Sequence, residues 1–190
     1  MKEKIILEPG EYHTTNCERI ICTVLGSCVS VCLIDKSTSL AGMNHFLLPE
    51  AIEKSKIYKS NSGHYGINAM ELLINEMMFR GARRTNLQAK VFGGGRVIKA
   101  FNTNQIPQSN IEFSLLFLET ERIPVISKDV GGNFGRKIFF YTKTGRVLVK
   151  KVGEIKLKQI EIEEISYKKR IVRKEKHGDF VLFDRRLQKR

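Results

Sequence analysis

A cysteine and a histidine in the first quarter of the chain have residue types and a spacing suited to nucleophilic chemistry. Cys28 directly follows the glycine turn Leu25-Gly26-Ser27, and His45 lies 17 residues further on. The polar stretch 35–39 predicts a turn, so two adjacent antiparallel strands could bring the thiol and the imidazole together. Such a pair can form a thiolate and an imidazolium, which makes cysteine an effective nucleophile near neutral pH. The glycine turn also lets backbone N–H groups approach an oxyanion.

Both residues also have an ordinary structural explanation. A cysteine in an apolar strand is usually a small buried hydrophobe, and a buried histidine is often only a hydrogen-bonded part of the core. A cysteine and a histidine count as a catalytic pair only when they are adjacent in space. Residue types and spacing alone therefore leave catalysis and structure open as alternatives.

The chain has four cysteines, and their spacing separates their expected roles. The N-terminal sequence lacks the apolar core of a signal peptide, so we expect a cytoplasmic protein with free thiols. The intervals between Cys17, Cys22, Cys28 and Cys32 do not match the close pairs of structural zinc sites, so we expect no metal. Cys28 and Cys32 share one face of a predicted strand but are separated by ~13 Å at ~3.3 Å per residue. Cys28, beside the turn, is the favoured nucleophile.

The periodicity of apolar residues predicts strands mixed with two helices. Residues 18–35 predict two strand pieces interrupted at the glycine turn, and residues 41–48 predict another strand. Apolar residues recurring every three or four positions predict a helix over 66–81, and a second helix is predicted over 110–121. Further strands are predicted over residues 87–92, 125–126, 137–141 and 146–152, with a hairpin turn at Thr144-Gly145 between the last two. This mixture indicates a layered α/β domain.

Charge divides the chain into two parts. We expect a catalytic domain over residues 1–152 and a basic extension over residues 153–190 that packs partly on it. Residues 151–190 hold 13 Lys and Arg against 7 Asp and Glu. Residues 154–176 could form a strand followed by a helix or be partly disordered, and the apolar cluster 180–183 could dock on the domain.

The net charge of +13 suits a polyanionic partner. No helix-turn-helix or aromatic RNA-binding signature accompanies it, so we expect no nucleic acid. No apolar run approaches the ~20 residues of a membrane span, so we expect no membrane insertion.

Six stretches of sequence, taken in order, resemble one known family, the CheD family of chemoreceptor glutamine deamidases. The resemblance covers about residues 10–183. It is carried by residues 23–33 (TVLGSCVSVCL), 42–49 (GMNHFLLP), 65–66 (YG) with 69–74 (AMELLI), 89–94 (AKVFGG), 129–137 (DVGGNFGRK) and 144–150 (TGRVLVK). It implies a three-layer α/β sandwich of sheets and helices, similar to the catalytic domain of cytotoxic necrotizing factor toxins.

The resemblance also implies an activity and a set of site residues. The activity is that of a protein-glutamine glutaminase, which hydrolyses glutamine side chains of chemoreceptors to glutamate and releases ammonia without a cofactor. The catalytic residues would be Cys28 as nucleophile, His45 as base and Thr23 as orienter of the imidazole. The oxyanion and the substrate would be bound near Gly26, Ser27 and Asn44.

The implied partners are the cytoplasmic helices of chemoreceptors and, in many bacteria, a phosphatase of the CheC family. The glycine-rich stretch 93–95 is predicted to be a tight turn at the mouth of the site, because it lacks the ending of a phosphate loop. Arg136 and Lys137 are candidates for contacts with acidic receptor helices. The alternative is an inactive binding module that engages a CheC-type phosphatase or a receptor.

Overall fold

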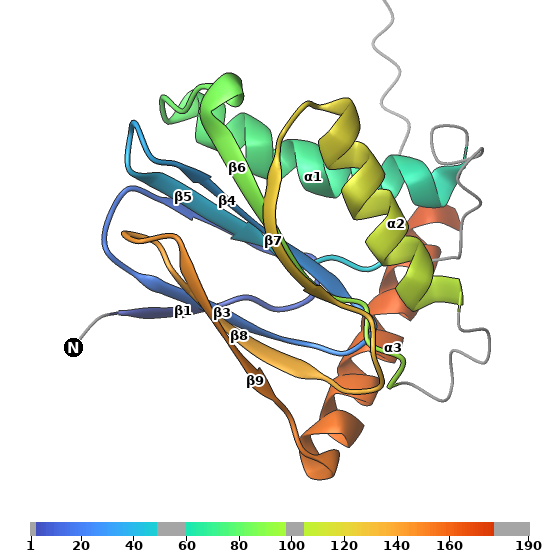
Figure 1. Cartoon of the computed structure of the whole chain (residues 1–190). Helices are drawn as coiled ribbons and strands as arrows, with labels where there is room; N and C mark the ends of the chain where they lie inside the picture. The colour runs from blue at the N-terminus through green and yellow to red at the C-terminus, as the bar shows by residue number, and fades with distance from the viewer. Residues whose placement is uncertain (1–2, 49–59, 98–104, 177–190) are drawn as a thin grey trace, which may run out of the picture.

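Two β-sheets form the centre of the molecule (Figure 1). The computed structural model describes residues 3–48, 60–97 and 105–176. One sheet has the strand order β2 (Tyr12–Thr15), β5 (Leu40–Asn44), β4 (Val29–Asp35), β6 (Leu87–Gly93) and β7 (Val125–Val130). The other has the order β1 (Lys4–Ile6), β3 (Ile20–Leu25), β8 (Arg136–Tyr141) and β9 (Arg146–Lys151).

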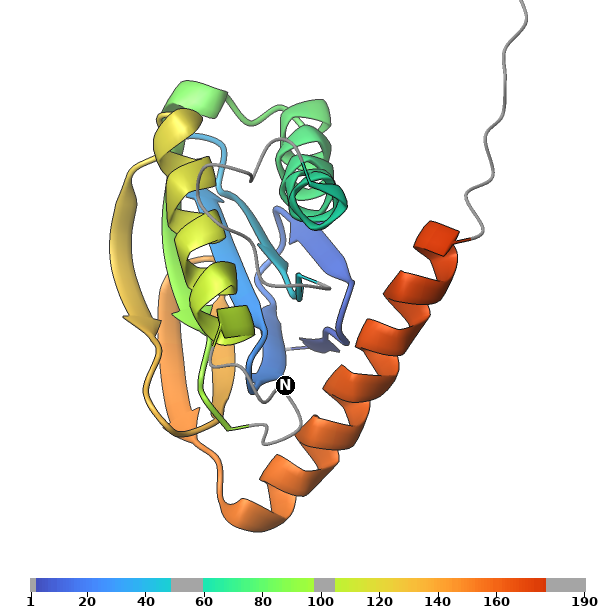
Figure 2. The same cartoon turned by 90° about the vertical axis from the view of Figure 1, so that its right-hand side faces the viewer.

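Strand β4 shows how the layers arise, because successive side chains of a strand point to opposite faces. Val29, Val31 and Leu33 pack into the core beneath the helices α1 (Asn61–Phe79) and α2 (Gln105–Thr120). Cys28 and Cys32 belong to the second core, which lies between the two sheets. The opposite faces expected for these two sets are confirmed, and the molecule is a mixed α/β fold with two sheets and three helices among the described residues (Figures 1 and 2).

Helix and strand positions agree with the sequence, but several boundaries differ. Helix α1 begins at Asn61, and α2 begins at Gln105 with Pro107 in its first turn, where a missing N–H costs no helical hydrogen bond. The strand predicted over 41–48 ends at Asn44, because beyond it only an isolated bridge joins Phe46 to Val29. The short strands β1 and β2 and the 3₁₀ turn η2 (Arg84–Asn86) have too few residues for a periodic signal.

The C-terminal segment contains the third helix, α3 (Glu154–Lys176). Residues 154–176 form one continuous helix, so the predicted strand within this segment is wrong. Figure 2 shows α3 leaving the end of β9 and running diagonally along one flank of the molecule. The predicted docking cluster at 180–183 lies outside the described residues. Within the described part of the chain, none of the helices combines the length and the apolar character required to cross a membrane.

Candidate active site

The turn that carries Cys28 connects the two sheets. Strand β3 ends at Leu25 in the four-stranded sheet, and β4 begins at Val29 in the five-stranded sheet. The intervening residues Gly26, Ser27 and Cys28 therefore lie outside both hydrogen-bonded ladders. Their N–H groups are not used by a neighbouring strand, so they are available to a ligand. Cys28 itself is completely buried.

His45 reaches the same place from the end of β5. Val29 and Phe46 exchange two backbone hydrogen bonds of 3.0 Å, which brings the preceding residues of both segments to the same end of the sheet. The Cys28 Sγ, a ring nitrogen of His45 and a carboxylate oxygen of Glu164 all lie within 4.8 Å of one another. The structure thus brings Cys28 and His45 together, and it adds a buried glutamate from α3.

Thr23 determines which nitrogen of His45 carries the proton. The Thr23 hydroxyl donates to the Leu7 carbonyl at 2.7 Å and lies 2.8 Å from His45 Nδ1. A hydroxyl has one proton, and its direction toward the Leu7 carbonyl favours the tautomer in which Nδ1–H donates to Thr23. The neutral ring then has its lone pair on Nε2, which is buried and has no hydrogen-bond partner among the described residues. Nε2 is therefore the atom left to accept a proton from Cys28.

Glu164 fills a site made by backbone N–H groups. Its Oε1 accepts hydrogen bonds from the N–H of Gly26 at 2.9 Å and of Cys28 at 3.2 Å. Its Oε2 accepts from the N–H of Ser27 at 3.0 Å and from the Ser27 hydroxyl. Converging N–H donors beside a nucleophile are the arrangement that stabilises the oxyanion of acyl transfer. The turn at Gly26–Cys28 is therefore an anion-binding site, and a carboxylate occupies it.

Cys28, His45 and Glu164 also provide the donor types of a small metal site. A metal ion would need the Glu164 oxygens as ligands, but both oxygens already accept backbone hydrogen bonds. The positive ends of these N–H dipoles point at the same position and favour an anion over a cation. The N–H groups of the turn therefore suit a carboxylate or an oxyanion better than a metal ion.

The electrostatics of the site oppose a negative charge on the Cys28 thiol while Glu164 is present. Burial raises the pKa of the Cys28 thiol well above its usual range, and the charge of Glu164 and its hydrogen bond with the thiol raise it further. Burial lowers the pKa of His45 to about 4, against the smaller opposite effect of a hydrogen bond with the Leu7 carbonyl. Both shifts favour a neutral thiol beside a neutral imidazole, not the ion pair expected from the sequence.

Comparisons with known proteins agree with the motifs. Residues 47–151 match the family described as CheD chemotactic sensory transduction. The chain is 43% identical over 175 residues to a probable chemoreceptor glutamine deamidase CheD of Laribacter hongkongensis, covering 92% of this chain and 85% of that protein. It is 44% identical over 178 residues to the protein of the same name in Methylobacillus flagellatus, covering 92% and 87%. The chain belongs to the CheD family.

The matched stretch 47–151 begins after Cys28 and His45, so the relationship in this region rests on the longer alignments with the CheD relatives. A solved structure, that of Bacillus licheniformis hypothetical protein YfiH, has a TM-score of 0.40 and 16% identity and covers 63% of this chain and 50% of that one. A likeness this weak does not bear on the fold.

The orientation of the N–H groups depends on Gly95, from the glycine-rich stretch expected at the mouth of the site, and on Asn110, which the sequence did not single out. Gly95 N–H donates to the Gly26 carbonyl at 2.7 Å, and the Asn110 side-chain amide donates to the Ser27 carbonyl at 2.9 Å. These two carbonyls share peptide planes with the N–H groups of Ser27 and Cys28, so each plane is held at both ends. Asn110 also accepts from the Leu48 N–H at 2.8 Å and is completely buried. It orients the anion-binding turn from α2.

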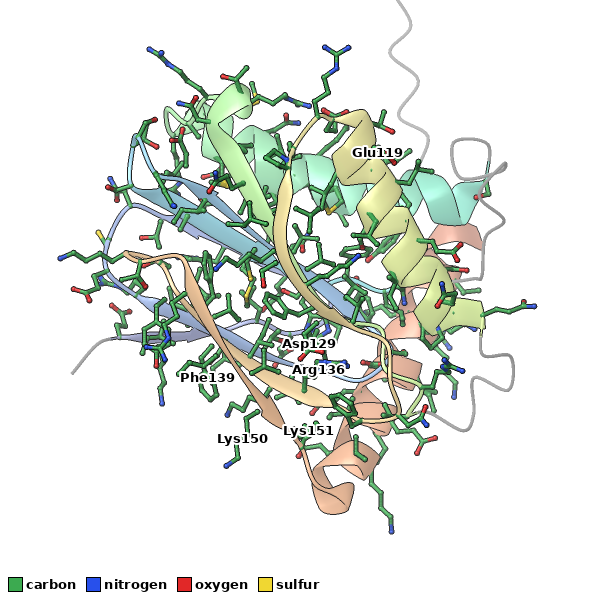
Figure 3. All side chains as sticks on the ribbon, viewed as in Figure 1. Glu119, Asp129, Arg136, Phe139, Lys150 and Lys151 are labelled. Atoms are coloured by element: carbon green, nitrogen blue, oxygen red, sulfur yellow. The ribbon has the colours of Figure 1, made fainter. Side chains whose placement is uncertain are left out.

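The glycine-rich loops brace this turn from outside. Gly94 N–H donates to the Cys28 carbonyl at 2.8 Å, and a Cβ on Gly93 would collide with that same carbonyl. Behind them, the buried guanidinium of Arg136 donates to Asp129 at 2.9 Å and to the Gly131 carbonyl at 2.7 Å (Figure 3). Arg136 is only 1% exposed, so the prediction that it contacts receptor helices is wrong. Its charge is used inside the fold.

Of the remaining expected site residues, the structure places Gly26 and Ser27 at the site and Asn44 away from it. The Asn44 side chain accepts from the Val31 N–H at 2.9 Å and donates to the Ala69 carbonyl of α1 at 3.3 Å. It therefore connects β4 to a helix on the other face of the sheet and is not brought together with Cys28.

Glu164 was missed because it lies 136 residues after Cys28, outside the stretches that carry the family resemblance. The signal that could have found it is its place in a helical stripe of apolar residues on α3.

Proposed function

We propose that this protein hydrolyses the side-chain amide of specific glutamines in chemoreceptors to glutamate, as a protein-glutamine glutaminase of chemotaxis adaptation. The proposed nucleophile is Cys28, the base is His45, and Thr23 orients the imidazole. Membership of the CheD family and the names of its relatives support the substrate. The arrangement of Thr23, His45 and Cys28 supports the roles of the residues.

The single observation that carries the proposal is the convergence of three backbone N–H groups on one carboxylate beside a thiol. A deamidation passes through a tetrahedral oxyanion and ends in a carboxylate, and one set of N–H donors suits both. The donors come from Gly26, Ser27 and Cys28, so the nucleophile and the oxyanion site belong to the same turn. Asn44 has no part in this proposal.

The reaction uses this chain's own groups. Cys28 Sγ attacks the carboxamide carbon while its proton moves to His45 Nε2, and the oxyanion is held by the N–H groups of the turn. The imidazolium then protonates the nitrogen of the former amide, which departs as ammonia. The acyl group remains on Cys28 Sγ as a thioester. A water gives its proton to His45 and attacks the thioester carbon. The thiol recovers its proton, and the net change is the conversion of one amide and one water to a carboxylate and ammonium.

Further parts of the proposal concern the setting of the enzyme. Residues 1–152 would be the catalytic domain, similar in fold to the catalytic domain of cytotoxic necrotizing factor toxins, and residues 153–190 the extension. The protein would act in the cytoplasm on the helical part of chemoreceptors, with a CheC-type phosphatase as a regulatory partner. Each converted glutamine adds one negative charge to a receptor helix, which changes the electrostatics of signalling.

Mass spectrometry of a receptor cytoplasmic fragment tests this function. Incubation with the protein should raise the mass by about one dalton per converted glutamine and release an equal amount of ammonia. The Cys28→Ala variant serves as the control and should leave the fragment unchanged. A fragment that binds the protein but gains no mass, with the wild type and with the Glu164→Ala variant alike, would instead indicate a binding module.

A further inference from the structure

The buried face of α3 has an unusual composition. The buried residues along its described part are Ile160, Glu164, Tyr167 and Ile171, which recur every three or four positions and form one stripe. Glu164 lies within this otherwise apolar stripe and is 1% exposed. A buried carboxylate without partners would destabilise the docked helix, but here four donors from the Cys28 turn compensate it. The carboxylate of this stripe therefore lies where the Cys28 turn supplies hydrogen-bond donors for it.

The chemical identity of this residue matters. Glutamate is the product side chain of glutamine deamidation, and here a glutamate on a helix lies in the anion site beside the nucleophile. We propose that α3 is an internal product mimic: it occupies the docking site of the substrate helix, with Glu164 in the position of the product glutamate. This inference rests on the proposed function. The receptor helix must then displace α3 before its glutamine can reach Cys28.

The docking site, which is the surface around Gly10, Gly26 and Tyr65 that α3 covers, fits a helix closely on both sides of Glu164. A Cβ on Gly26 would lie 2.8 Å from Ile160 and 3.0 Å from the Glu164 carboxylate. Gly10, with a φ of 92°, lies so close to the Tyr167 ring that any side chain there would collide with it. The Tyr167 hydroxyl also contacts that of Tyr65 in α1.

These contacts define the helix that the docking site accepts. The reactive side chain enters the anion site at Gly26, as Glu164 does. Largely apolar side chains lie one turn before it and one and two turns after it, in the positions of Ile160, Tyr167 and Ile171. A receptor helix with this pattern around a glutamine therefore suits the same surface.

The docked helix keeps the enzyme inactive in two ways. The Glu164 oxygens use the N–H groups of Gly26 and Cys28 that a substrate oxyanion needs. The negative charge next to Sγ also opposes formation of the thiolate. Removal of α3 from the docking site frees the donors and lowers the cost of ionising Cys28 at the same time.

If Glu164 occupies the product position, a glutamine introduced at this position is a substrate. In a Glu164→Gln variant, the amide oxygen takes the position of Oε1, and the NH₂ group faces the Ser27 hydroxyl. Cys28 Sγ then attacks the Cδ of the introduced amide, His45 transfers the proton to the departing ammonia, and water hydrolyses the thioester. The chain restores Glu164 at the expense of one water and releases one ammonia. The restored carboxylate gains the Ser27 N–H as a donor, which favours the product.

The experiment measures the mass of the side chain at position 164 in full-length variants. Purified Glu164→Gln protein should gain about one dalton, and peptide fragmentation should place the gain at position 164. Glu163→Gln is the matched control, because Glu163 is exposed on the neighbouring position of α3 and bonds to Gln159. It should keep its new amide. The double variant Cys28→Ala/Glu164→Gln should keep its amide as well.

The same proteins separate the failure of this inference from failure of the proposed function. If the Glu164→Gln variant keeps its amide at position 164 while it converts the receptor fragment, the product mimic is wrong and the deamidase stands. If neither amide is converted, both proposals are wrong. If the amide at position 164 is converted but no receptor is, the mimic stands and the receptor is the wrong substrate.

Kinetics give a second and independent test. Glu164→Ala removes the carboxylate from the docking site, so kcat/KM for a receptor fragment should rise about tenfold or more, as the competent fraction increases. Glu163→Ala should leave kcat/KM within about twofold of the wild type. An unchanged or reduced kcat/KM in Glu164→Ala, with normal folding by circular dichroism, would overturn the inhibitory role.

Discussion

Two cysteines on the same face of the same segment, Cys28 and Cys32, are buried to the same degree and have different surroundings. Both side chains are at most 1% exposed, and burial is the largest cause of the raised pKa of both thiols. Cys32 lies inside β4, where it pairs with Met43 on one side and Lys90 on the other. Cys28 lies one residue before β4 begins, beside His45 and the anion-binding turn.

These two residues show that burial alone does not distinguish the proposed reactive thiol from a structural one. Inside the strand, the backbone N–H and carbonyl groups around Cys32 are committed to the neighbouring strands. Where the chain crosses from one sheet to the other, the N–H groups of Gly26, Ser27 and Cys28 have no ladder to satisfy them. Buried N–H groups require partners, so this crossing must bind an acceptor. The proposed nucleophile therefore lies where the sheets leave N–H donors free to bind an acceptor, which here is Glu164.

Removal of the Cys28 sulfur should produce the largest effect. The Cys28→Ala variant loses the proposed nucleophile, and conversion of a receptor fragment should fall by a factor on the order of 10⁴ or more. The fold should persist, because the turn is held by backbone hydrogen bonds from Gly94 and Gly95 and by Asn110. Ammonia release and circular dichroism measure the two properties. Substantial turnover in a folded Cys28→Ala protein would transfer the nucleophile to another thiol and reverse the comparison.

Thr23 should have a smaller effect on the rate, because it acts through His45. Thr23→Val keeps the shape and removes the hydroxyl that accepts from Nδ1–H, so kcat should fall about 10- to 100-fold. Thr14→Val is the matched control: Thr14 is also a buried strand threonine, and its hydroxyl has no hydrogen-bond partner among the described residues. Steady-state kinetics of both variants measure the difference. Equal rates in both would mean that Thr23 does not orient the imidazole.

The part of the site that local sequence could predict is the part built from neighbouring strands. Alternation along residues 28–33 placed Cys28 and the valines on opposite faces, and a short turn made β4 and β5 antiparallel partners. The same alternation explains why Asn44 is not brought together with Cys28. Consecutive side chains of a strand point to opposite faces, and the Asn44 side chain bonds to α1 on the other face of the sheet.

Glu164 and Asn110 could not be predicted, because their roles depend on how helices distant in sequence dock on the turn. Asn110 is one of three buried polar residues of α2, with Ser109 and Ser114, and its contact with the Ser27 carbonyl is what gives it a function. Glu164 lies among charged residues, and the mixed charge of residues 153–177 concealed the stripe of Ile160, Tyr167 and Ile171. The charges predicted that Glu164 lies on a solvated surface, but it is buried because α3 packs against the Cys28 turn.

The buried imidazole should make stability depend on pH. The pKa of His45 is lowered from 6.5 to about 4 by burial, so the unfolded chain binds this proton at a higher pH than the folded protein does. The contribution is fully present above pH 6.5 and is lost as the pH falls toward 4. Between about pH 7.5 and about pH 5 it amounts to about 2 kcal/mol of unfolding free energy. Urea unfolding of the wild type and of His45→Asn at both pH values measures it.

The wild type should lose about 2 kcal/mol more than His45→Asn over this range. His13, whose pKa is also lowered by burial and by Arg80, contributes equally in both proteins, so the difference isolates His45. Equal losses in the two proteins would mean that His45 is accessible to protons in the folded state. The same result would weaken the inference that the site is closed by α3.

The smallest effect on activity should come from Cys32, which completes the comparison with Cys28. Cys32→Ala removes a sulfur from the core between the sheets, and the cavity should lower the unfolding free energy by about 1 to 2 kcal/mol. Turnover of a receptor fragment should stay near that of the wild type, because the strand keeps its pairing with Met43 and Lys90. Urea unfolding and ammonia release measure the two properties on the same preparation. A well-folded Cys32→Ala protein without activity would show that the interior of β4, and not only the turn before it, takes part in the chemistry.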